Sequence, residues 1–345
     1  MKENVEKYSK SLIDSIKTIV LESRKKIVRT VNYQLIETYW NIGREIVDNE
    51  RSKGIDSKSA RQQILQLSKE LTQELGKGFS RSNLFNMRKL YLTYTNVQTL
   101  SGQLSWSHIC ELLTIEDENK RAFYEKESSN SNWSFRELKR QINSSLYERL
   151  LLSSGKVNKK KVIEYSKKGQ KFDTPSDIIK NPYVFEFLGI PEKKPILEKE
   201  LERKLIRHIE DFLLELGRGF MFVGSQQRLT INNTHYYVDM VFYNKVLKCY
   251  ILIELKTTKL KISDGGQLNT YLNYYKTEVN DKSDNQPIGI ILCAEKDEVA
   301  AEYILGGFDN NVFASKYTYV LPQKEDLIKE LENVMNEQSP EHNNG

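Results

Sequence analysis

The hydrophobic periodicity changes once along the chain, close to residue 217. Upstream of that point, large apolar residues recur every three or four positions, a spacing that places them on one side of a helix. Downstream, three runs at 219–231, 234–244 and 247–258 are rich in Tyr, Phe, Ile and Val, as strands are. The 345 residues therefore predict an all-helical domain followed by a mixed α/β domain, an α+β multidomain chain.

The expected domain boundaries follow composition. We expect a helical domain at 1–152, a lysine-rich linker at 153–180, a mixed α/β domain at 181–335 and a disordered tail at 336–345. The helices expected before the first strand are 5–50, 58–75, 81–95, 104–115, 118–128, 134–153 and 196–216. After the three strands we expect helices at 263–279, 297–307 and 324–335 and strands at 286–295 and 317–322.

Composition argues against several classes of protein. No apolar stretch approaches the roughly 20 residues of a membrane helix, and the N-terminus lacks the apolar core of a secretory signal. Three cysteines without a CxxC pair argue against a disulfide framework and indicate a reducing cytoplasm. Because only four histidines are present, we expect any metal ion to be held by carboxylates.

Charge is distributed unevenly. The net charge is +5, yet residues 1–180 sum to +11 and residues 181–345 sum to −6. The front of the chain could therefore attract a polyanion, whereas the back would repel one unless its acids bind a cation.

One cluster of charged residues stands at the ends of two expected strands. Glu254 and Lys256 close an almost continuous apolar run and point to one face, roughly 6.8 Å apart along the strand. Asp239 lies among apolar residues on the preceding strand, and a hairpin would place it beside Glu254. Solvated residues at a strand end are the plainer interpretation, but an unpaired carboxylate among apolar neighbours costs several kcal/mol.

Such a cluster suits phosphodiester hydrolysis. A hard cation can neutralise phosphate oxygens and lower the pKa of a bound water, and Mg²⁺ needs only one or two carboxylates besides the phosphate. A neighbouring lysine can orient the water or stabilise charge in the transition state. Gln267 opens the next expected helix and points back to the strand ends, with Tyr271 one turn later.

Together these residues resemble the PD-(D/E)XK nuclease core with the Q-x-x-x-Y element of its RecB-like branch. The wider text is similar to the YhcG-type nuclease family over about residues 10–335. In the second half the similar phrases are FLLELGRGFMFVGSQQRL, YYVDMVFYNKVLKCYILIELK and GQLNTYLNYY. In the first half they are VNYQLIETYWNIGREIV, LTQELGKGFSRSNLFNMRKLY, LSWSH and SFRELKRQINSSLYERL.

The resemblance implies a restriction-endonuclease-like fold and a nuclease dependent on Mg²⁺, with Mn²⁺ as the alternative ion. It implies that Asp239 and Glu254 hold the metal with the carbonyl group of Leu255, and that Lys256 acts on the water. Gln267 and Tyr271 would support the site or the substrate. An acid on the first helix of such folds often joins the site, and Glu202 is the candidate, ahead of Glu198. Val238 stands where the family pattern usually has proline.

The helical domain carries a basic stretch without a single acid at 75–110. The expected helices 58–75 and 81–95 could form a helix-turn-helix unit that binds DNA. An ordinary basic face on a helical bundle is the alternative. The candidate nucleic-acid contacts there are Lys77, Arg81, Arg88 and Lys89. On the first strand, Gln226, Gln227 and Arg228 could reach a phosphate, or could simply be an exposed polar strand end.

Three functions remain open at this point. The first is a metal-dependent DNA nuclease targeted by its helical domain. The second is a nucleic-acid-binding or partner-binding regulatory module whose nuclease fold is silent or self-inhibited. The third is a nuclease acting on RNA. Cleavage of both strands of a duplex would require two active sites, which a homodimer would supply.

Overall fold

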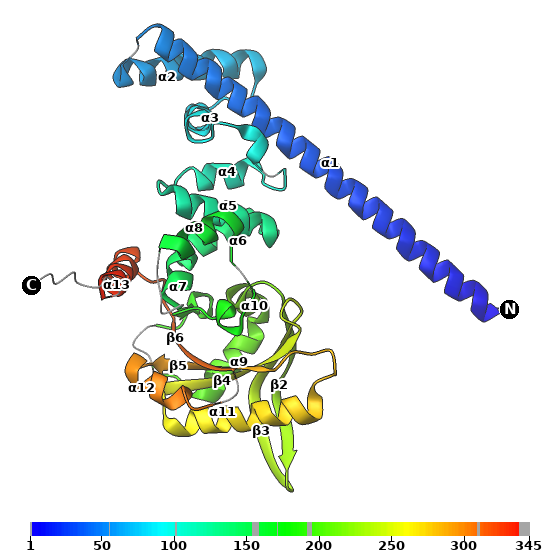
Figure 1. Ribbon diagram of the computed structural model, residues 1–345. Helices are drawn as coiled ribbons and strands as arrows, with labels where there is room; N and C mark the ends of the chain where they lie inside the picture. The colour runs from blue at the N-terminus through cyan, green and yellow to red at the C-terminus, as the bar shows by residue number, and fades with distance from the viewer. Residues whose placement is uncertain are drawn as a thin grey trace, which may run out of the picture. The chain divides into compact units, whose positions relative to one another are not determined.

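The computed structural model describes residues 2–54, 56–100, 102–153, 159–170, 172–191, 195–308 and 311–337 (Figure 1). Contacts between residues divide the chain into two compact units, 1–138 and 139–345. The first is helical and the second contains a six-stranded mixed sheet, so the predicted fold class is confirmed. The segment 139–152, expected with the helical domain, groups with the second unit. None of the described helices has an apolar stretch long enough to cross a membrane.

The first unit is built from helices throughout its described residues. They are α1 (Lys2–Ser52), α2 (Ser57–Leu75), α3 (Arg81–Thr93), the short 3₁₀ helix η1 (Val97–Thr99), α4 (Trp106–Leu112), α5 (Glu118–Asn130) and the start of α6 (Phe135–Asn143). Ser80 caps α3 as expected, because its hydroxyl accepts a hydrogen bond from the Asn83 N–H at 3.3 Å. The division between the two units falls inside α6.

The C-terminal half of α1 packs closely on α3. A Cβ atom at Gly43 would lie 2.0 Å from the Met87 carbonyl oxygen, so only glycine permits this approach. Ile46 of α1, Ile64 of α2 and Leu84 of α3 complete the buried cluster around Met87. The core of the first unit therefore uses the helical apolar spacing that predicted these three helices.

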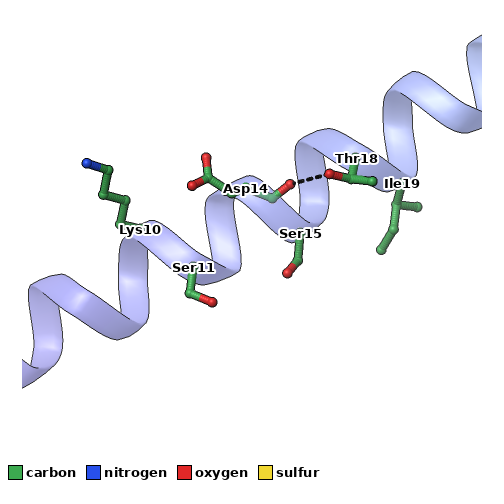
Figure 2. A pocket seen from close by; sticks show the side chains of 6 residues that line it. All are labelled: Lys10, Ser11, Asp14, Ser15, Thr18 and Ile19. Atoms are coloured by element: carbon green, nitrogen blue, oxygen red, sulfur yellow. Dashed lines mark hydrogen bonds between the residues drawn. The ribbon is translucent and has the colours of Figure 1, made fainter. Parts of the chain in front are cut away.

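The N-terminal half of α1 behaves differently. Figure 2 shows side chains from Lys10 to Ile19, all of which belong to this one helix. Between residues 10 and 31, its large apolar side chains lie in solvent rather than in a core. They are Leu12, Ile13, Ile16, Ile19, Val20, Leu21, Ile27, Val28 and Val31.

The second unit surrounds its sheet with helices. The strands are β1 (Tyr183–Val184), β2 (Phe220–Ile231), β3 (Thr234–Asn244), β4 (Cys249–Lys259), β5 (Ile288–Glu295) and β6 (Asn311–Thr318). The α-helices are α7 (Leu146–Ser153), α8 (Lys159–Lys168), α9 (Glu198–Arg207), α10 (Ile209–Leu216), α11 (Ile262–Tyr274), α12 (Glu298–Leu305) and α13 (Lys324–Glu337). Shorter helical turns are η2 (Pro175–Ile178), η3 (Glu186–Leu188) and the π-helix η4 (Tyr275–Val279).

The sheet has the strand order β1-β6-β5-β4-β3-β2. Strands β2, β3 and β4 form an antiparallel meander, and β4, β5, β6 and β1 run parallel to one another. Helices α9 and α10 bury Leu201 and Phe212 against one face, whereas α11 buries Leu268 against the other (Figure 1). Because both faces are covered, β4 and β5 are apolar on both sides, as a continuous apolar run predicts.

Two expected helices are each divided in the structure. The helix expected at 134–153 is wrong as a single element, because Ser145 adopts a positive φ of 54° and separates α6 from α7. The helix expected at 196–216 breaks at His208, whose ψ of 37° lies outside the helical region. In both cases the apolar spacing continues across the break, so periodicity alone does not reveal it.

The last strands also differ from the expectation. The strand expected at 317–322 is wrong in position, because β6 spans Asn311–Thr318 and pairs with β5 from Ile288 onward. Two-residue β1 was not expected as a strand and pairs with the end of β6. The middle of β6 consists of small and polar residues. Ser315 is fully buried there, and its hydroxyl donates a hydrogen bond to the Lys180 carbonyl oxygen. The tail beyond residue 337 lies outside the described residues.

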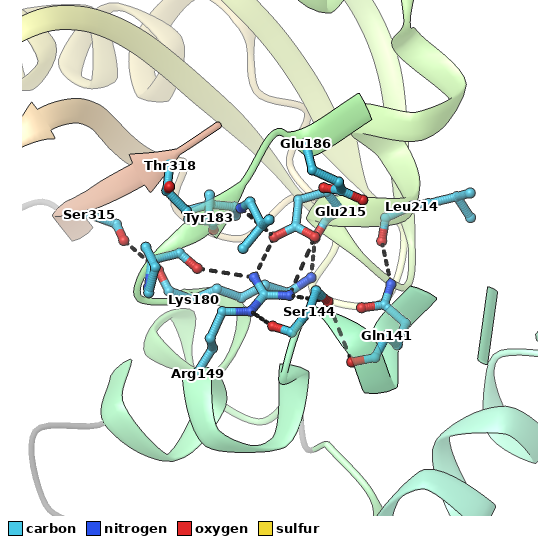
Figure 3. Close-up of polar contacts among 12 residues, drawn as sticks. Gln141, Ser144, Arg149, Lys180, Tyr183, Glu186, Leu214, Glu215, Ser315 and Thr318 are labelled. Carbon is cyan, nitrogen blue, oxygen red and sulfur yellow. Dashed lines mark hydrogen bonds and ion pairs between the residues drawn. The ribbon is translucent and has the colours of Figure 1, made fainter. Parts of the chain in front are cut away.

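A buried ion cluster lies within the second unit (Figure 3). Glu215 of α10 is completely buried, and its Oε1 atom lies 2.5 Å from Nη1 of Arg149, which is also completely buried. Arg140 reaches the other carboxylate oxygen at 3.2 Å. Lys180 donates its ammonium group to the Glu215 main-chain carbonyl oxygen. The cluster attaches 140–149 to the sheet, since Arg149 also donates to the Pro182 carbonyl oxygen at 3.0 Å.

Candidate active site

The expected carboxylates meet where β3 and β4 separate. The Asp239 N–H donates to Oε1 of Glu254 at 3.3 Å, and the Leu255 N–H donates to Oδ2 of Asp239 at 2.9 Å. Regular pairing of these strands begins one residue later, at Met240 opposite Ile253. The main-chain N–H groups that do not take part in strand pairing at this point therefore donate hydrogen bonds to the two acids.

Burial makes both acids difficult to ionise. The side chain of Glu254 is only 3% exposed, and burial together with the nearby charge of Asp239 raises its pKa to about 8. The ammonium group of Lys256, 3.7 Å from Oε2 of Glu254, opposes this shift only partly. Burial also raises the pKa of Asp239, against the hydrogen bond from Leu255. Two carboxylates thus share one lysine, which leaves the pair under-neutralised.

Helix α11 supplies the second layer of the site. Nε2 of Gln267 lies 3.1 Å from Oε2 of Glu254 and 3.0 Å from the hydroxyl oxygen of Tyr271. Burial, followed by the charge of Glu254, raises the pKa of Tyr271 and keeps its hydroxyl protonated. Gln267 therefore holds Glu254 in place and also contacts Tyr271, which lies one turn later on α11.

Helix α9 brings two more acids to the same place. Glu202 is 7% exposed and accepts a hydrogen bond at 2.9 Å from Gln226, whose amide also donates to Asp239 at 3.2 Å. Burial and the charge of Asp239 raise the pKa of Glu202. Glu198 accepts from the Thr257 N–H at 3.2 Å and lies 4.0 Å from the ammonium nitrogen of Lys256. The structure thus places both α9 candidates beside the Asp239–Glu254 pair.

A cleft of about 420 Å³ opens beside the pair. Its walls come from α9, β2 and β3, and it is lined by Glu198, Lys199, Glu202, Arg203, Gln226 and Asp239. Lys199 and Arg203 are exposed on α9, so the cleft is lined by both acids and cations. A phosphate entering it would approach Asp239 past two positive side chains.

Of the two glutamines named on the first strand, Gln226 contacts the acids and Gln227 does not. Nε2 of Gln227 lies only near the Ser225 carbonyl oxygen, at 3.4 Å, and Arg228 is exposed on β2. Register explains the difference. The hairpin turns at Asn232 and Asn233, so Gln227 pairs with Val238 and Gln226 lies opposite Asp239. Counting outward from the Asn-Asn turn distinguishes Gln226 from Gln227 in the sequence.

The basic candidates of the first unit fall into two groups. Lys77, Arg81 and Lys89 are exposed on α3 and the turn before it. Arg88 instead forms an ion pair with Glu50 of α1 at 2.7 Å, and Glu50 is 6% exposed. Arg88 therefore holds α3 to α1, and a phosphate would have to compete with a buried carboxylate for it.

Similarity to known proteins agrees with this geometry. Residues 176–332 match the family described as the YhcG PDDEXK nuclease domain, and residues 15–149 match the DUF1016 N-terminal domain. The Escherichia coli (strain K12) protein named "Putative nuclease YhcG" is 37% identical over 350 residues, covering 92% of each chain. The chain belongs to the YhcG PDDEXK nuclease family. The resemblance seen in the sequence is thus confirmed, and the second unit of this YhcG-family chain carries a PDDEXK nuclease domain.

Two solved structures show weaker likeness. They are described as a repair endonuclease from Pyrococcus abyssi and as EndoMS in apo form. The first is 15% identical with a TM-score of 0.25 and covers 39% of this chain and 50% of that one. The second is 16% identical with the same TM-score and covers 38% of this chain and 49% of that one.

PDDEXK nucleases use divalent metal ions, and the donor set of this YhcG-family chain fits one. The described residues contain no group of three or more His, Cys, Asp or Glu side chains arranged to hold a metal ion. They do contain the under-neutralised Asp239–Glu254 pair, in which Glu254 is buried and Asp239 partly buried, with oxygen donors only. Mg²⁺ suits such a pair, because it prefers oxygen ligands and completes its shell with water and substrate phosphate.

Proposed function

We propose that this protein is a Mg²⁺-dependent nuclease that hydrolyses phosphodiester bonds of DNA at the Asp239–Glu254–Lys256 cluster. The observation that carries the proposal is the under-neutralised Asp239–Glu254 pair, with Asp239 lining a cleft, in a domain of the PDDEXK nuclease family. A buried acid with a raised pKa favours the arrival of a cation, and a phosphate diester favours the same cation from its other side.

Each residue has a definite part in this proposal. Asp239 and Glu254 hold the metal with the carbonyl oxygen of Leu255, and the metal supplies charge neutralisation and an activated water when bound. Lys256 orients that water or stabilises the charge that develops on the phosphate. Gln267 and Tyr271 fix the position of Glu254.

Two further residues support Asp239 from the α9 side. Gln226 joins Asp239 to Glu202, so Glu202 either completes the metal shell through water or holds Asp239 in place. This sharing of one amide between two acids supports the choice of Glu202 over Glu198 for that part.

Basic side chains of the first unit are proposed to bind the DNA backbone. Lys77, Arg81 and Lys89 are exposed and can each form a salt-sensitive phosphate contact. The two helices α2 and α3 around the turn at 76–80 would act as a helix-turn-helix unit, with Arg81 at the start of its second helix. Arg228, and Gln227 beside it, would contact the substrate from β2.

The proposal includes a cytoplasmic location and an assembly of two copies. Support for the first is that Cys110, Cys249 and Cys293 are all free thiols, as expected in a reducing compartment. Support for the second is chemical, since cutting both strands of a duplex requires two active sites.

Cleavage assays test the proposed function. Purified protein with Mg²⁺ should cut at least one of four labelled substrates: single-stranded, double-stranded or branched DNA, or RNA. Asp239→Asn, Glu254→Gln and Lys256→Ala should each reduce the rate by about 10³-fold or more while circular dichroism stays unchanged. Cleavage by all three variants at the wild-type rate would exclude this site.

The alternative functions give different results in the same assay. Cleavage of RNA alone would replace DNA as the substrate. Salt-dependent binding of nucleic acid without cleavage of any substrate would favour a regulatory module with a silent nuclease fold. Manganese should replace Mg²⁺ in the wild-type protein, since both accept oxygen ligands.

A further inference from the structure

The hairpin of β2 and β3 extends beyond the rest of the sheet (Figure 1). Pairing of β3 with β4 begins at Met240, so within the described sheet residues 234–239 of β3 pair only with β2. The two strands continue as a ribbon to a two-residue turn at Asn232 and Asn233, both with positive φ, as hairpins of this length require. We call residues 226–238 the arm.

The two faces of the arm have different surroundings. On one face, Leu229 and Val238 are buried in the cluster that packs on α11, and the ring of Tyr236 lies 6.2 Å from that of Tyr271. This face anchors the arm to the domain. The opposite face lies in solvent, so it has no part in the core.

Four exposed side chains make up the outer face of the arm. Strand register pairs Arg228 with Tyr237 and Thr230 with His235, and each pair shares that face. Nδ1 of His235 lies 3.1 Å from the hydroxyl oxygen of Thr230, and 49% of Tyr237 is exposed. This face therefore exposes an aromatic ring, a guanidinium group and an imidazole side by side, and none of them packs in the core.

This outer face leads directly to the active site. His235 and Tyr237 alternate along β3 on the face away from α11. Asp239, two residues beyond Tyr237, lines the cleft formed with α9, which covers that same side of the sheet. Tyr237 stands about 7 Å from Asp239 along the strand and His235 about 14 Å. These spans correspond to about two and four steps of a stacked nucleic-acid strand, which rises about 3.4 Å per nucleotide.

We propose that the outer face of the arm holds an unpaired nucleic-acid strand next to the scissile phosphate, with Tyr237 stacked on a base about two nucleotides from the cut. This rests on the proposed nuclease function and narrows its substrate. A half-exposed tyrosine offers a flat face to a base, and base–aromatic stacking requires that the base has left its duplex partner.

The charged neighbours fit the same strand. Arg228, beside Tyr237, reaches the backbone of the stacked nucleotide, and His235 reaches a phosphate further along. At the other end of the path, Lys199 and Arg203 line the cleft where the phosphate meets Asp239. The preferred substrate is therefore nucleic acid with a single-stranded region beside the cleavage point, such as a single strand, a flap or a fork.

A base-deletion experiment tests the contact. Cleavage of a single strand is measured with Mg²⁺ for substrates that carry one abasic nucleotide at each position from one to six steps on either side of the cut. For the wild-type protein, one position close to two steps away should raise KM by roughly fivefold or more, as loss of one stacked base does. Positions beyond the arm should have little effect.

Substitution at Tyr237 completes the test. Tyr237→Ala should raise KM on the intact substrate by the same factor, leave kcat within about twofold, and lose all sensitivity to the abasic position. Tyr237→Phe, which keeps the ring, should restore the wild-type pattern. Tyr303→Ala on α12, a tyrosine that is 85% exposed and distant in sequence from the site, is the matched control and should change nothing.

The outcomes distinguish a failure of the arm proposal from a failure of the proposed nuclease function. If the wild-type protein cleaves no nucleic acid, the proposed function itself fails. If it cleaves but no abasic position matters, or if Tyr237→Ala retains the abasic sensitivity, the arm proposal is overturned and the nuclease function stands. A preference for intact duplex over single strands and forks would also overturn it.

Discussion

Two buried glutamates of the second unit have opposite electrostatics. Glu215 of α10 and Glu254 of β4 are both almost fully buried, and burial alone raises the pKa of each. Around Glu215, however, Arg149, Lys180 and Arg140 lower its pKa to about 2. Around Glu254, the second carboxylate of Asp239 outweighs Lys256, and its pKa rises to about 8.

The difference lies in where the neutralising charge comes from. The protein itself supplies three cations to Glu215, and they also attach the segment 140–149 to the sheet (Figure 3). It supplies only one lysine to the two acids Asp239 and Glu254. Glu215 is neutralised by side chains of the protein itself, whereas the proposed catalytic pair would gain stability from a divalent cation.

Removing the structural carboxylate gives the largest expected effect. Glu215→Gln should lower the free energy of unfolding by roughly 3–5 kcal/mol, because Arg149 would remain buried without its counter-charge. Urea denaturation followed by circular dichroism measures the change. As the control, Glu186→Gln removes a partly exposed partner of Arg140 and should cost no more than about 1 kcal/mol.

Acid titration is a second test of the contribution of Glu215 to stability. Its pKa in the folded protein is depressed from 4.5 to about 2, so its contribution is fully present above pH 4.5 and is lost as pH falls toward 2. That contribution amounts to roughly 3 kcal/mol at 1.36 kcal/mol per pH unit. Glu215→Gln should lose this part of the acid dependence. An identical acid profile for variant and wild type would contradict the assignment.

Glu254 should respond to pH in the opposite direction. Its folded pKa is raised from 4.5 to about 8, so its own contribution to stability is fully present below pH 4.5 and is lost as pH rises toward 8 in the absence of metal. Without metal, Glu254→Gln should therefore melt several degrees above wild type at pH 8 and at the same temperature below pH 4.5. Differential scanning fluorimetry measures both.

Adding a divalent cation is a further test of the difference between Glu215 and Glu254. If the ionised pair holds Mg²⁺ as proposed, the ion should raise the melting temperature of the wild type more at pH 8 than at pH 5. The rise should vanish in Glu254→Gln and persist in Glu186→Gln. If Mg²⁺ stabilises wild type and Glu254→Gln equally, the ion binds elsewhere.

The sequence predicts one glutamate of this pair far better than the other. Glu254 ends an apolar run and stands two residues before Lys256, so local text is enough to single it out. Glu215 lies in an ordinary helical stretch, and its partner Arg149 is 66 positions away. Only the tertiary fold brings these two charges together, so no local pattern indicates that either is buried.

The same distinction explains the errors in the fold. Strands β3 and β4 match their predicted limits closely because both are rich in β-branched and aromatic residues. Strand β6 was placed too late, since its small and polar middle is buried by β5 and β1 rather than by its own hydrophobicity. Ser315 illustrates this, because its burial depends on the Lys180 carbonyl oxygen 135 residues earlier.

The choice between Gln226 and Gln227 tests the site at its finest level. Gln226→Ala removes the amide that joins Glu202 to Asp239 and should lower metal affinity or kcat by about 10–100-fold, as loss of a ligand's supporting partner does. Gln227→Ala, one residue away on the same strand, should stay within about twofold. Comparing cleavage rates across a Mg²⁺ titration measures both. Equal losses would mean that β2 matters for its fold alone, whereas a loss confined to Gln226→Ala would assign it to Asp239, because only that side chain contacts the acid.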